Sequence, residues 1–222
     1  MEKVLFSWSG GKDSALALYE TLHSENYEVA SLLTTITEDY DRVSLHGVRR
    51  TLIEQQAHAL GLPLTEVFIP KDCANGDYEA RMGATLAAFK QNGVSRVAFG
   101  DIFLEEIRKY REDNLAKLGI GGLFPLWGRD SAALIQSFIS QGFEAITTCI
   151  DSRALGASFL GRKLDREFLA DLPPQVDPAG ENGEFHSFVF SGPIFKERIA
   201  FKPGERVSRD SFRFCDLLPE TS

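Results

Sequence analysis

The residues best suited to chemistry stand near the start of the chain, in the run Ser9-Gly10-Gly11-Lys12-Asp13-Ser14. Two adjacent glycines let the backbone fold back, so that successive N–H groups converge on one point. The serines supply hydroxyls, the lysine supplies a mobile cation, and a helix that begins here adds its partial positive charge. The run therefore predicts a cradle for a phosphate or pyrophosphate group rather than a plain glycine turn.

This run differs from a Walker A loop, which places a glycine five positions before its Gly-Lys-Ser/Thr step. Here Lys12 is followed by Asp13, so a carboxylate takes the place of the usual magnesium-binding hydroxyl. The spacing resembles the pyrophosphate loop of the N-type ATP pyrophosphatases, which cleave ATP between the α and β phosphates. That resemblance implies that the loop holds the departing pyrophosphate while an acceptor carboxylate or carbonyl takes the adenylyl group.

A second polar block, Gly180-Glu181-Asn182-Gly183-Glu184-Phe185-His186-Ser187, lies near the end of the chain. A carboxylate at a binding site can chelate magnesium, hold an ammonium ion, or act as general base for an incoming amine. The alternative is a hairpin turn closed by Asn182-Gly183, with its polar side chains in solvent. The residue types alone leave both interpretations open.

These two blocks, with Gly100-Asp101-Ile102 between them, occur in the same order in the diphthine–ammonia ligase family, also called diphthamide synthase. The segment Phe188–Phe195 also resembles that family, and the resemblance spans nearly the whole chain. It implies that ATP adenylates a carboxylate, that ammonia then displaces AMP, and that pyrophosphate leaves. In eukaryotic and archaeal members the carboxylate sits on a modified histidine of translation elongation factor two. The sequence does not identify the acceptor of this chain.

The resemblance also implies roles for residues at matching positions. Ser9 through Ser14 would hold the phosphates, with Gly100 beside them and with Asp13 or Asp101 as ligands of Mg²⁺. Asp101 has an alternative role as the residue that begins a helix. The backbone of Thr35, Ile36 and Thr37 would border the adenine. The residues expected to act in catalysis are Lys12, Asp101, Glu181, Glu184 and His186, and those expected to bind the substrate are Asn182, Gly183 and Ser187. His46 either approaches the nucleotide or is a surface histidine.

Strands and helices alternate over the first two thirds of the chain. Apolar runs predict strands at 3–8, 29–36, 64–69, 96–100 and 143–149. Helical patterns occupy 48–60, 78–90, 104–118 and 131–141, the last with Asp130 as its cap. This order predicts an α/β, Rossmann-like, doubly wound parallel sheet. Because ligands bind at the carboxyl ends of such strands, the loop 9–14, the segment 34–39 and Gly100-Asp101 should lie at one edge.

After Cys149 the pattern changes to a short helix at 162–169 and aromatic, strand-like pieces at 185–190, 194–195 and 211–218. We therefore expect an ATP-binding domain at 1–150 and a small α+β region on the substrate side at 151–222. The aromatic pieces, with Phe212 and Phe214, either form the core of this region or bury against a second copy of the chain. Six basic residues stand in the last part of this region: Lys196, Arg198, Lys202, Arg206, Arg209 and Arg213. They either bind an acidic protein or an RNA, or prevent an edge strand from aggregating.

Composition narrows the function classes. The chain has 222 residues and a formal net charge of −8, which disfavours bulk binding of nucleic acid, and no apolar run is long enough for a membrane helix. Its three cysteines form no paired motif, so we expect a reducing, cytoplasmic setting and a buried structural thiol at Cys149. Two alternatives to the ligase stay open at this point: an enzyme that thiolates a tRNA base, and an ATP-binding regulatory protein without turnover.

Overall fold

A parallel sheet carries the glycine-rich loop at its carboxyl edge. The computed structural model describes residues 1–44 and 46–220. β1 (Glu2–Ser7) lies between β2 (Tyr27–Thr37) and β5 (Val94–Ala98). Outside these, β4 (Leu64–Ile69) pairs with β2, and β6 (Gly121–Leu123) pairs with β5. All four pairings are parallel, so the predicted doubly wound sheet is confirmed. The order reverses at β1, which makes its carboxyl end the switch point where ligands bind.

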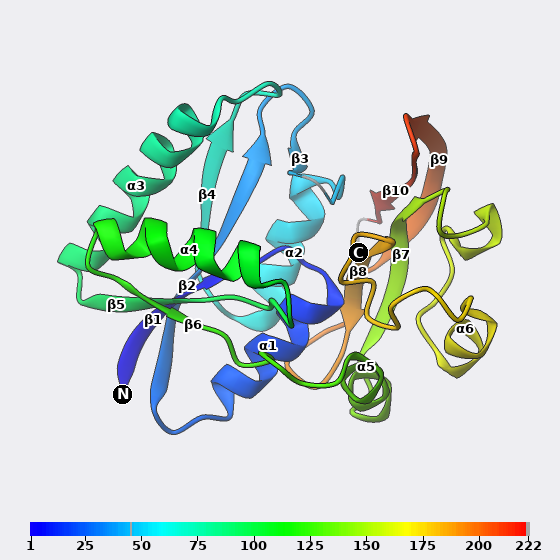
Figure 1. Cartoon of the computed structure of the whole chain (residues 1–222), viewed down its shortest axis with the longest axis horizontal. Helices are drawn as coiled ribbons and strands as arrows, with labels where there is room; N and C mark the ends of the chain where they lie inside the picture. The colour runs from blue at the N-terminus through cyan, green and yellow to red at the C-terminus, as the bar shows by residue number, and fades with distance from the viewer. Residues whose placement is uncertain (45, 221–222) are drawn as a thin grey trace.

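Four helices cover the two faces of this sheet (Figure 1). α1 (Lys12–Leu22) and α2 (Arg50–Leu60) lie on one face, and α3 (Asn75–Gln91) and α4 (Glu105–Lys117) lie on the other. Neighbouring residues of β1 show why the strand is apolar throughout: Leu5 packs into the α3–α4 core, whereas Phe6 packs into the α1–α2 core. A strand buried on both faces reads as a continuous apolar run.

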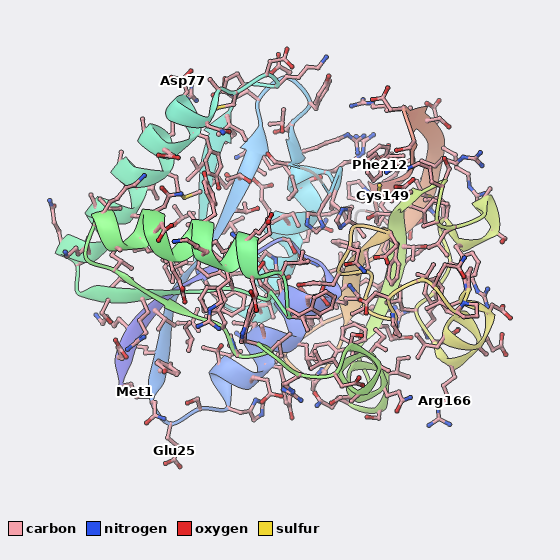
Figure 2. All side chains as sticks on the ribbon, viewed as in Figure 1. Met1, Glu25, Asp77, Cys149, Arg166 and Phe212 are labelled. Carbon is pink, nitrogen blue, oxygen red and sulfur yellow. The ribbon has the colours of Figure 1, made fainter. Side chains whose placement is uncertain are left out.

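A second, antiparallel sheet follows, with the order β8-β7-β10-β9. Its strands are β7 (Glu144–Asp151), β8 (Phe185–Ser191), β9 (Phe201–Arg209) and β10 (Phe212–Pro219), and Figure 1 shows it beside the parallel sheet. Three short helices accompany it, α5 (Ser131–Ser140), η1 (Ala157–Phe159) and α6 (Arg166–Asp171). In β10, Phe214 pairs with Cys149 of β7, and Figure 2 shows Cys149 and Phe212 close together on this sheet.

The strand at 143–149 forms, but its expected place in the parallel sheet was wrong. β7 pairs antiparallel with β8 and β10 and makes no ladder with the first sheet among the described residues. An apolar run shows that a strand is buried, whereas its neighbour is chosen by long-range pairing that the run does not encode. The division of the chain at residue 150 stays a prediction, and the pairing of β7 favours a boundary that precedes it.

Smaller differences have local causes. Asp130 caps α5 as predicted, because its side chain accepts a hydrogen bond from the N–H of Ala133 at 2.8 Å. The short helix near 162 begins only at Arg166, since Asp165 caps it in the same way. The strand expected at 194–195 is a turn. β9 was not predicted, because it is a polar edge strand with little apolar alternation.

The two sheets share one hydrophobic core. Side chains of α1 and α2 pack in the same cluster as Phe185, Phe188 and Val189 of β8. Two backbone hydrogen bonds cross the junction, from Val189 N to Gly10 O at 2.9 Å and from Lys196 N to Ala59 O at 2.8 Å. The second sheet is therefore fixed against the glycine-rich loop. Among the described residues, no helix has both the length and the apolar character needed to cross a bilayer.

Candidate functional site

The glycine-rich loop joins β1 to α1 and is held from three sides. Gly10 has a φ of +77°, a conformation that favours glycine, and its carbonyl accepts hydrogen bonds from Val189 N and from Gln56 Nε2. Gly11 is the N-cap of α1, so the next N–H groups of the helix belong to its unpaired first turn. One of them, on Lys12, donates to Ser187 Oγ at 3.1 Å. The loop and the second polar block therefore meet directly.

The serine hydroxyls shape the same loop. Ser9 Oγ accepts a hydrogen bond from Gly11 N at 3.3 Å and donates to Ser14 Oγ at 3.1 Å. Ser14 Oγ in turn donates to Gly11 O at 2.9 Å. A Cβ on Gly11 would lie 3.1 Å from the carbonyl oxygen of Ser187, so the loop and β8 approach closely at this point. These contacts preorganise a small concave backbone of the kind that binds phosphate.

Lys12 places a buried cation beside the loop. Its side chain is 5 % exposed, and Nζ lies 2.8 Å from Asp13 Oδ2 and 5.0 Å from the centre of the Phe185 ring. Burial raises the pKa of Asp13, while the charge of Lys12 opposes that shift. An ammonium group held this way supplies positive charge where phosphate oxygens would gather.

Glu181 connects the second block to the end of β5. Its Oε1 accepts a hydrogen bond from the N–H of Ile102 at 2.8 Å. Burial raises the pKa of Glu181 to about 7, and the negative charges of Asp13 and Asp101 act in the same direction. A carboxylate with this pKa is half protonated near neutral pH, which suits a general base or acid. The structure thus brings all three predicted motifs into one place.

Glu184 and Asn182 belong to the same turn but have a different setting. Glu184 is 8 % exposed, and its Oε1 accepts hydrogen bonds from Asp177 N at 3.0 Å and from Asn182 Nδ2 at 3.1 Å. Its other oxygen is buried with no hydrogen-bond partner among the described residues. Gly183 has a φ of +86°, so the block is also a turn, as the alternative interpretation required. These contacts shape the loop that presents Glu181.

Two histidines lie together next to Gly11. The ring centroids of His46 and His186 are 4.5 Å apart, and His46 Cε1 is 3.7 Å from the position of a Cβ on Gly11. Burial lowers the pKa of His186 to about 4, and it lowers the pKa of His46 well below its usual value. His46 is therefore a neutral, half-buried group beside the loop rather than a surface histidine. Leu45, which precedes it in the sequence, lies outside the described residues.

A cavity of about 220 Å³ opens at the carboxyl ends of β1, β2 and β5. Trp8, Ser9, Thr35 and His46 line it on one side, and Phe99 and Tyr110 line it on the other. The cavity offers apolar and aromatic walls next to the glycine-rich loop, which would suit an adenosine group. Ile36 is instead buried in the α1–α2 core, and Thr37 lines a neighbouring cleft. Of the three residues expected at the adenine, only Thr35 lines this cavity.

Gly100 and Asp101 follow β5. A Cβ on Gly100 would lie 2.8 to 2.9 Å from backbone atoms of Asp13 and Ser14, so this glycine permits close packing of β5 on the start of α1. Asp101 Oδ2 lies 2.8 Å from Arg111 Nε. Neither Asp13 nor Asp101 belongs to a group of three or more metal-ligating side chains in the part of the chain that the structure describes.

Sequence reasoning missed Gln56 as part of the site. Its side chain is fully buried, accepts a hydrogen bond from Trp8 Nε1 at 2.9 Å, and donates to Gly10 O at 3.0 Å and to Val189 O at 2.6 Å. The available signal was a polar residue on the apolar face of the helix 48–60. No sequence pattern pointed to Asp177, whose N–H donates to Glu184, or to Arg111, which pairs with Asp101.

Cys149 lies in the second sheet, on β7, where it pairs with His186 of β8. It is buried, and burial raises the pKa of its thiol to about 12. A thiol with that pKa stays protonated and is a poor nucleophile at neutral pH. This setting fits the expected structural role and provides no sulfur carrier for a thiolation reaction.

Comparison with known proteins gives two family matches. The family model "Diphthamide synthase N-terminal domain" matches residues 2–121, and "Diphthamide synthase C-terminal domain" matches residues 130–218. A diphthine–ammonia ligase of Danio rerio is 28% identical, over 92% of this chain and 89% of the relative. One of Schizosaccharomyces pombe is also 28% identical, over 97% of this chain but only 38% of the longer relative. A solved structure titled as a predicted subunit of tRNA methyltransferase from Methanocaldococcus jannaschii aligns with a TM-score of 0.41 and 18% identity, over 71% of this chain and 82% of that one.

Proposed function

This chain belongs to the diphthamide synthase family, and we propose on that basis that it uses ATP to join ammonia to a carboxylate, releasing AMP and pyrophosphate. The relatives that it matches are named diphthine–ammonia ligases. The observation that supports the proposal most is that the second block contacts both other motifs: Ser187 accepts a hydrogen bond from Lys12 N, and Glu181 accepts one from Ile102 N. A phosphate loop and an acid–base group therefore share one site.

The first step is adenylation. ATP lies with its adenosine in the 220 Å³ cavity and its phosphates at the loop, where the backbone N–H groups of the α1 N-terminus and the Lys12 ammonium face the negative charge. An oxygen of the acceptor carboxylate attacks the α-phosphorus, and the bond to the β-phosphate oxygen breaks. Charge on the departing pyrophosphate develops beside a buried cation and aligned N–H dipoles, which stabilise the transition state.

In the second step, ammonia attacks the carbonyl carbon of the acyl adenylate and AMP leaves with its bonding electrons. The nitrogen must lose a proton as the amide forms. Glu181, with a pKa of about 7, accepts that proton near neutral pH. Neutral His186 and His46 border the loop without adding positive charge that would compete with Lys12.

Magnesium enters with ATP in this proposal. Mg²⁺ in nucleotide sites is commonly held by phosphate oxygens with one or two protein carboxylates, so a preformed cluster of three ligands is not required. Asp13 would hold the ion from the protein side, because its carboxylate lies at the loop, 2.8 Å from Lys12 Nζ. Asp101 is the second candidate, and its contact with Arg111 fixes its position.

Product analysis by phosphorus NMR tests the function. The protein is incubated with Mg-ATP, ammonium and elongation factor two that carries diphthine, purified from cells without their own diphthine–ammonia ligase. We expect AMP and pyrophosphate from the wild type, and losses of about a hundredfold or more in Lys12→Ala and Glu181→Gln. Formation of ADP and phosphate, or ATP binding with no turnover for any carboxylate, would refute the ligase and favour another phosphoryl chemistry or a regulatory protein.

A further inference from the structure

A second cleft, of about 660 Å³, adjoins the nucleotide cavity. Five residues line both: Thr35, Val43, Ser44, Tyr78 and Tyr110. The cleft runs from the ends of β2 and β4 to the β9–β10 hairpin, so one wall belongs to each sheet. A molecule lying in this cleft would reach the nucleotide without crossing any other element.

The charge of the cleft is opposite to that of the molecule. The chain has a net charge of −8, yet the lining contains Arg42, Lys71 and Arg209 and, among the described residues, no carboxylate. Arg42 is already neutralised by an ion pair with Asp216 at 2.8 Å. Lys71 and Arg209 are exposed cations with no ion pair among the described residues, and a cleft lined by one sign of charge attracts the opposite sign.

These two cations converge on one ring. Lys71 Nζ lies 5.7 Å and Arg209 Cζ lies 4.8 Å from the centre of Tyr40. Lys71 follows β4 of the parallel sheet, whereas Arg209 ends β9 of the second sheet. Two like charges gathered at one ring from two separate sheets repel each other, and an anion bound near both of them would reduce that repulsion.

We propose that this cleft binds the acceptor, with Lys71 and Arg209 receiving anionic groups of the polypeptide that carries the reacting carboxylate. The inference rests on the proposed function and adds to it the place where the acceptor binds. Nucleic acid, the other polyanion that such a cleft fits, is disfavoured by the net charge of the whole chain. The two cations act by binding, so they should affect the KM for the acceptor and not that for ATP.

Cys73 provides a probe that needs no acceptor. It lines the cleft, and it is the one cysteine of the described residues that is not buried. Iodoacetate is an anion and iodoacetamide is neutral, so the ratio of their alkylation rates at Cys73, followed by mass spectrometry at low salt, reports the local potential. We expect this ratio to fall about tenfold in the double variant Lys71→Glu/Arg209→Glu. The matched control Lys202→Glu/Arg213→Glu changes the net charge equally outside the cleft and should leave the ratio unchanged.

The binding test uses diphthine-bearing elongation factor two as the probe. We expect the factor to slow alkylation of Cys73 in the wild type, and the cleft double variant to raise the KM for the factor at least tenfold with an unchanged KM for ATP. An unchanged alkylation ratio, protection by total tRNA and not by the factor, or a raised KM for ATP alone would each overturn the inference. If the factor protects Cys73 but no AMP forms, the ligase is refuted and the binding site is kept. If AMP forms but the factor does not protect Cys73, the ligase is kept and the binding site is refuted.

Discussion

His46 and His186 lie with their ring centroids 4.5 Å apart, although one follows the short strand β3 (Arg42–Val43) and the other belongs to β8. Both are half-buried near the Lys12 cation, and in both the loss of solvent lowers the pKa. Two imidazoles in this position can be packed together only while they are neutral, since protonation would add like charge next to an existing cation. The pair therefore links the stability of the site to pH.

The contribution of His186 to the free energy of unfolding should fall as pH drops from 6.5 towards 4. In this window the unfolded chain protonates His186, at its usual pKa of 6.5, while the folded chain, with a pKa of about 4, does not. The contribution of His186 is thus complete above pH 6.5 and lost by about pH 4, and it amounts to roughly 3 kcal/mol. Urea unfolding of the wild type and of His186→Gln across this range measures it.

The comparison with His186→Gln is necessary because Glu181 acts in the opposite direction. Its pKa is raised to about 7, so the folded state binds more protons than the unfolded state between pH 4.5 and 7. That carboxylate makes the protein more stable as pH falls through the same window. The wild-type curve alone would therefore mix two slopes, whereas the difference between the two proteins isolates His186. A constant difference from pH 7 to pH 4 would show that His186 titrates normally in the folded state.

Replacing Glu181 with Gln should remove a pH dependence of activity. In the wild type, kcat/KM should rise with pH and level off above an apparent pKa near 7, as Glu181 loses its proton. Gln keeps an oxygen that accepts the hydrogen bond from Ile102 N but cannot take a proton. We therefore expect kcat/KM to fall a hundredfold or more and to lose its rise with pH near pH 7. A profile of AMP release between pH 5.5 and 9 checks this. If the variant keeps the rise of kcat/KM near pH 7, that pH dependence belongs to another group.

Gly100→Ala should weaken nucleotide binding, because the added methyl group would be packed too closely against the start of α1. The new Cβ would fall 2.8 to 2.9 Å from backbone atoms of Asp13 and Ser14, which cannot move without shifting the start of α1. Overpacking of this kind costs about 1 to 3 kcal/mol, and we expect the affinity for ATP to fall at least tenfold. Gly83→Ala is the matched control: it stands within α3, where a Cβ meets nothing within 4 Å, and should stabilise the protein slightly. Equal effects of the two changes would contradict this account.

Gln56→Leu should destabilise the protein and loosen the loop. The change leaves the buried indole N–H of Trp8 and the carbonyl of Val189 without this partner. Each buried polar group left unpaired costs about 1 to 3 kcal/mol, so we expect a total loss of roughly 3 kcal/mol. Urea unfolding gives the stability, and titration with ATP gives the effect on the loop. Gln55→Leu, on the same helix and without contacts to the loop, should leave ATP affinity unchanged.

The sequence predicted the parts of the site that depend on local patterns. The strand–glycine–helix step at 9–14, the strands at the centre of the parallel sheet, and the cap at Asp130 each follow from residue type and spacing within a short window. The two polar blocks were expected in one site only through the family resemblance. Their contact, from Lys12 N to Ser187 Oγ, depends on the whole fold.

What the sequence did not predict lies between elements. β7 belongs to the second sheet because it pairs with β8 and β10, which follow much later in the chain. An apolar run predicts a buried strand but not the strand with which it pairs. The contact of the Ile36 backbone with the adenine stays a prediction, whereas alternation along β2 turns the Ile36 side chain into the core and leaves Thr35 at the cavity. Gln56 joins β1, the loop and β8 through three hydrogen bonds that no local pattern contains.

Asp216 holds the turn that carries His46. Its Oδ1 accepts from Arg42 Nη1 at 2.8 Å and its Oδ2 accepts from Arg49 Nη2 at 2.6 Å, while Arg42 Nη1 also donates to Gly47 O at 2.7 Å. The two guanidinium groups lower the pKa of Asp216 to about 2, against an opposing effect of its burial. One carboxylate on β10 thus fastens both ends of the turn against the second sheet.

Asp216→Asn should therefore cost about 2 kcal/mol of stability at pH 7. Because the pKa is lowered in the folded state, this stabilisation is complete above about pH 3.8 and lost as pH falls towards 2, so the wild type and the variant should converge there. Thermal unfolding at pH 7 and near pH 2.5 measures both, with Asp113→Asn as a control, since that exposed pair with Lys109 should contribute less than 1 kcal/mol. The KM for ATP should also rise in Asp216→Asn, because Ser44 and His46 line the nucleotide cavity. Loss of stability with an unchanged KM would show that the ion pairs join the sheets without positioning the turn.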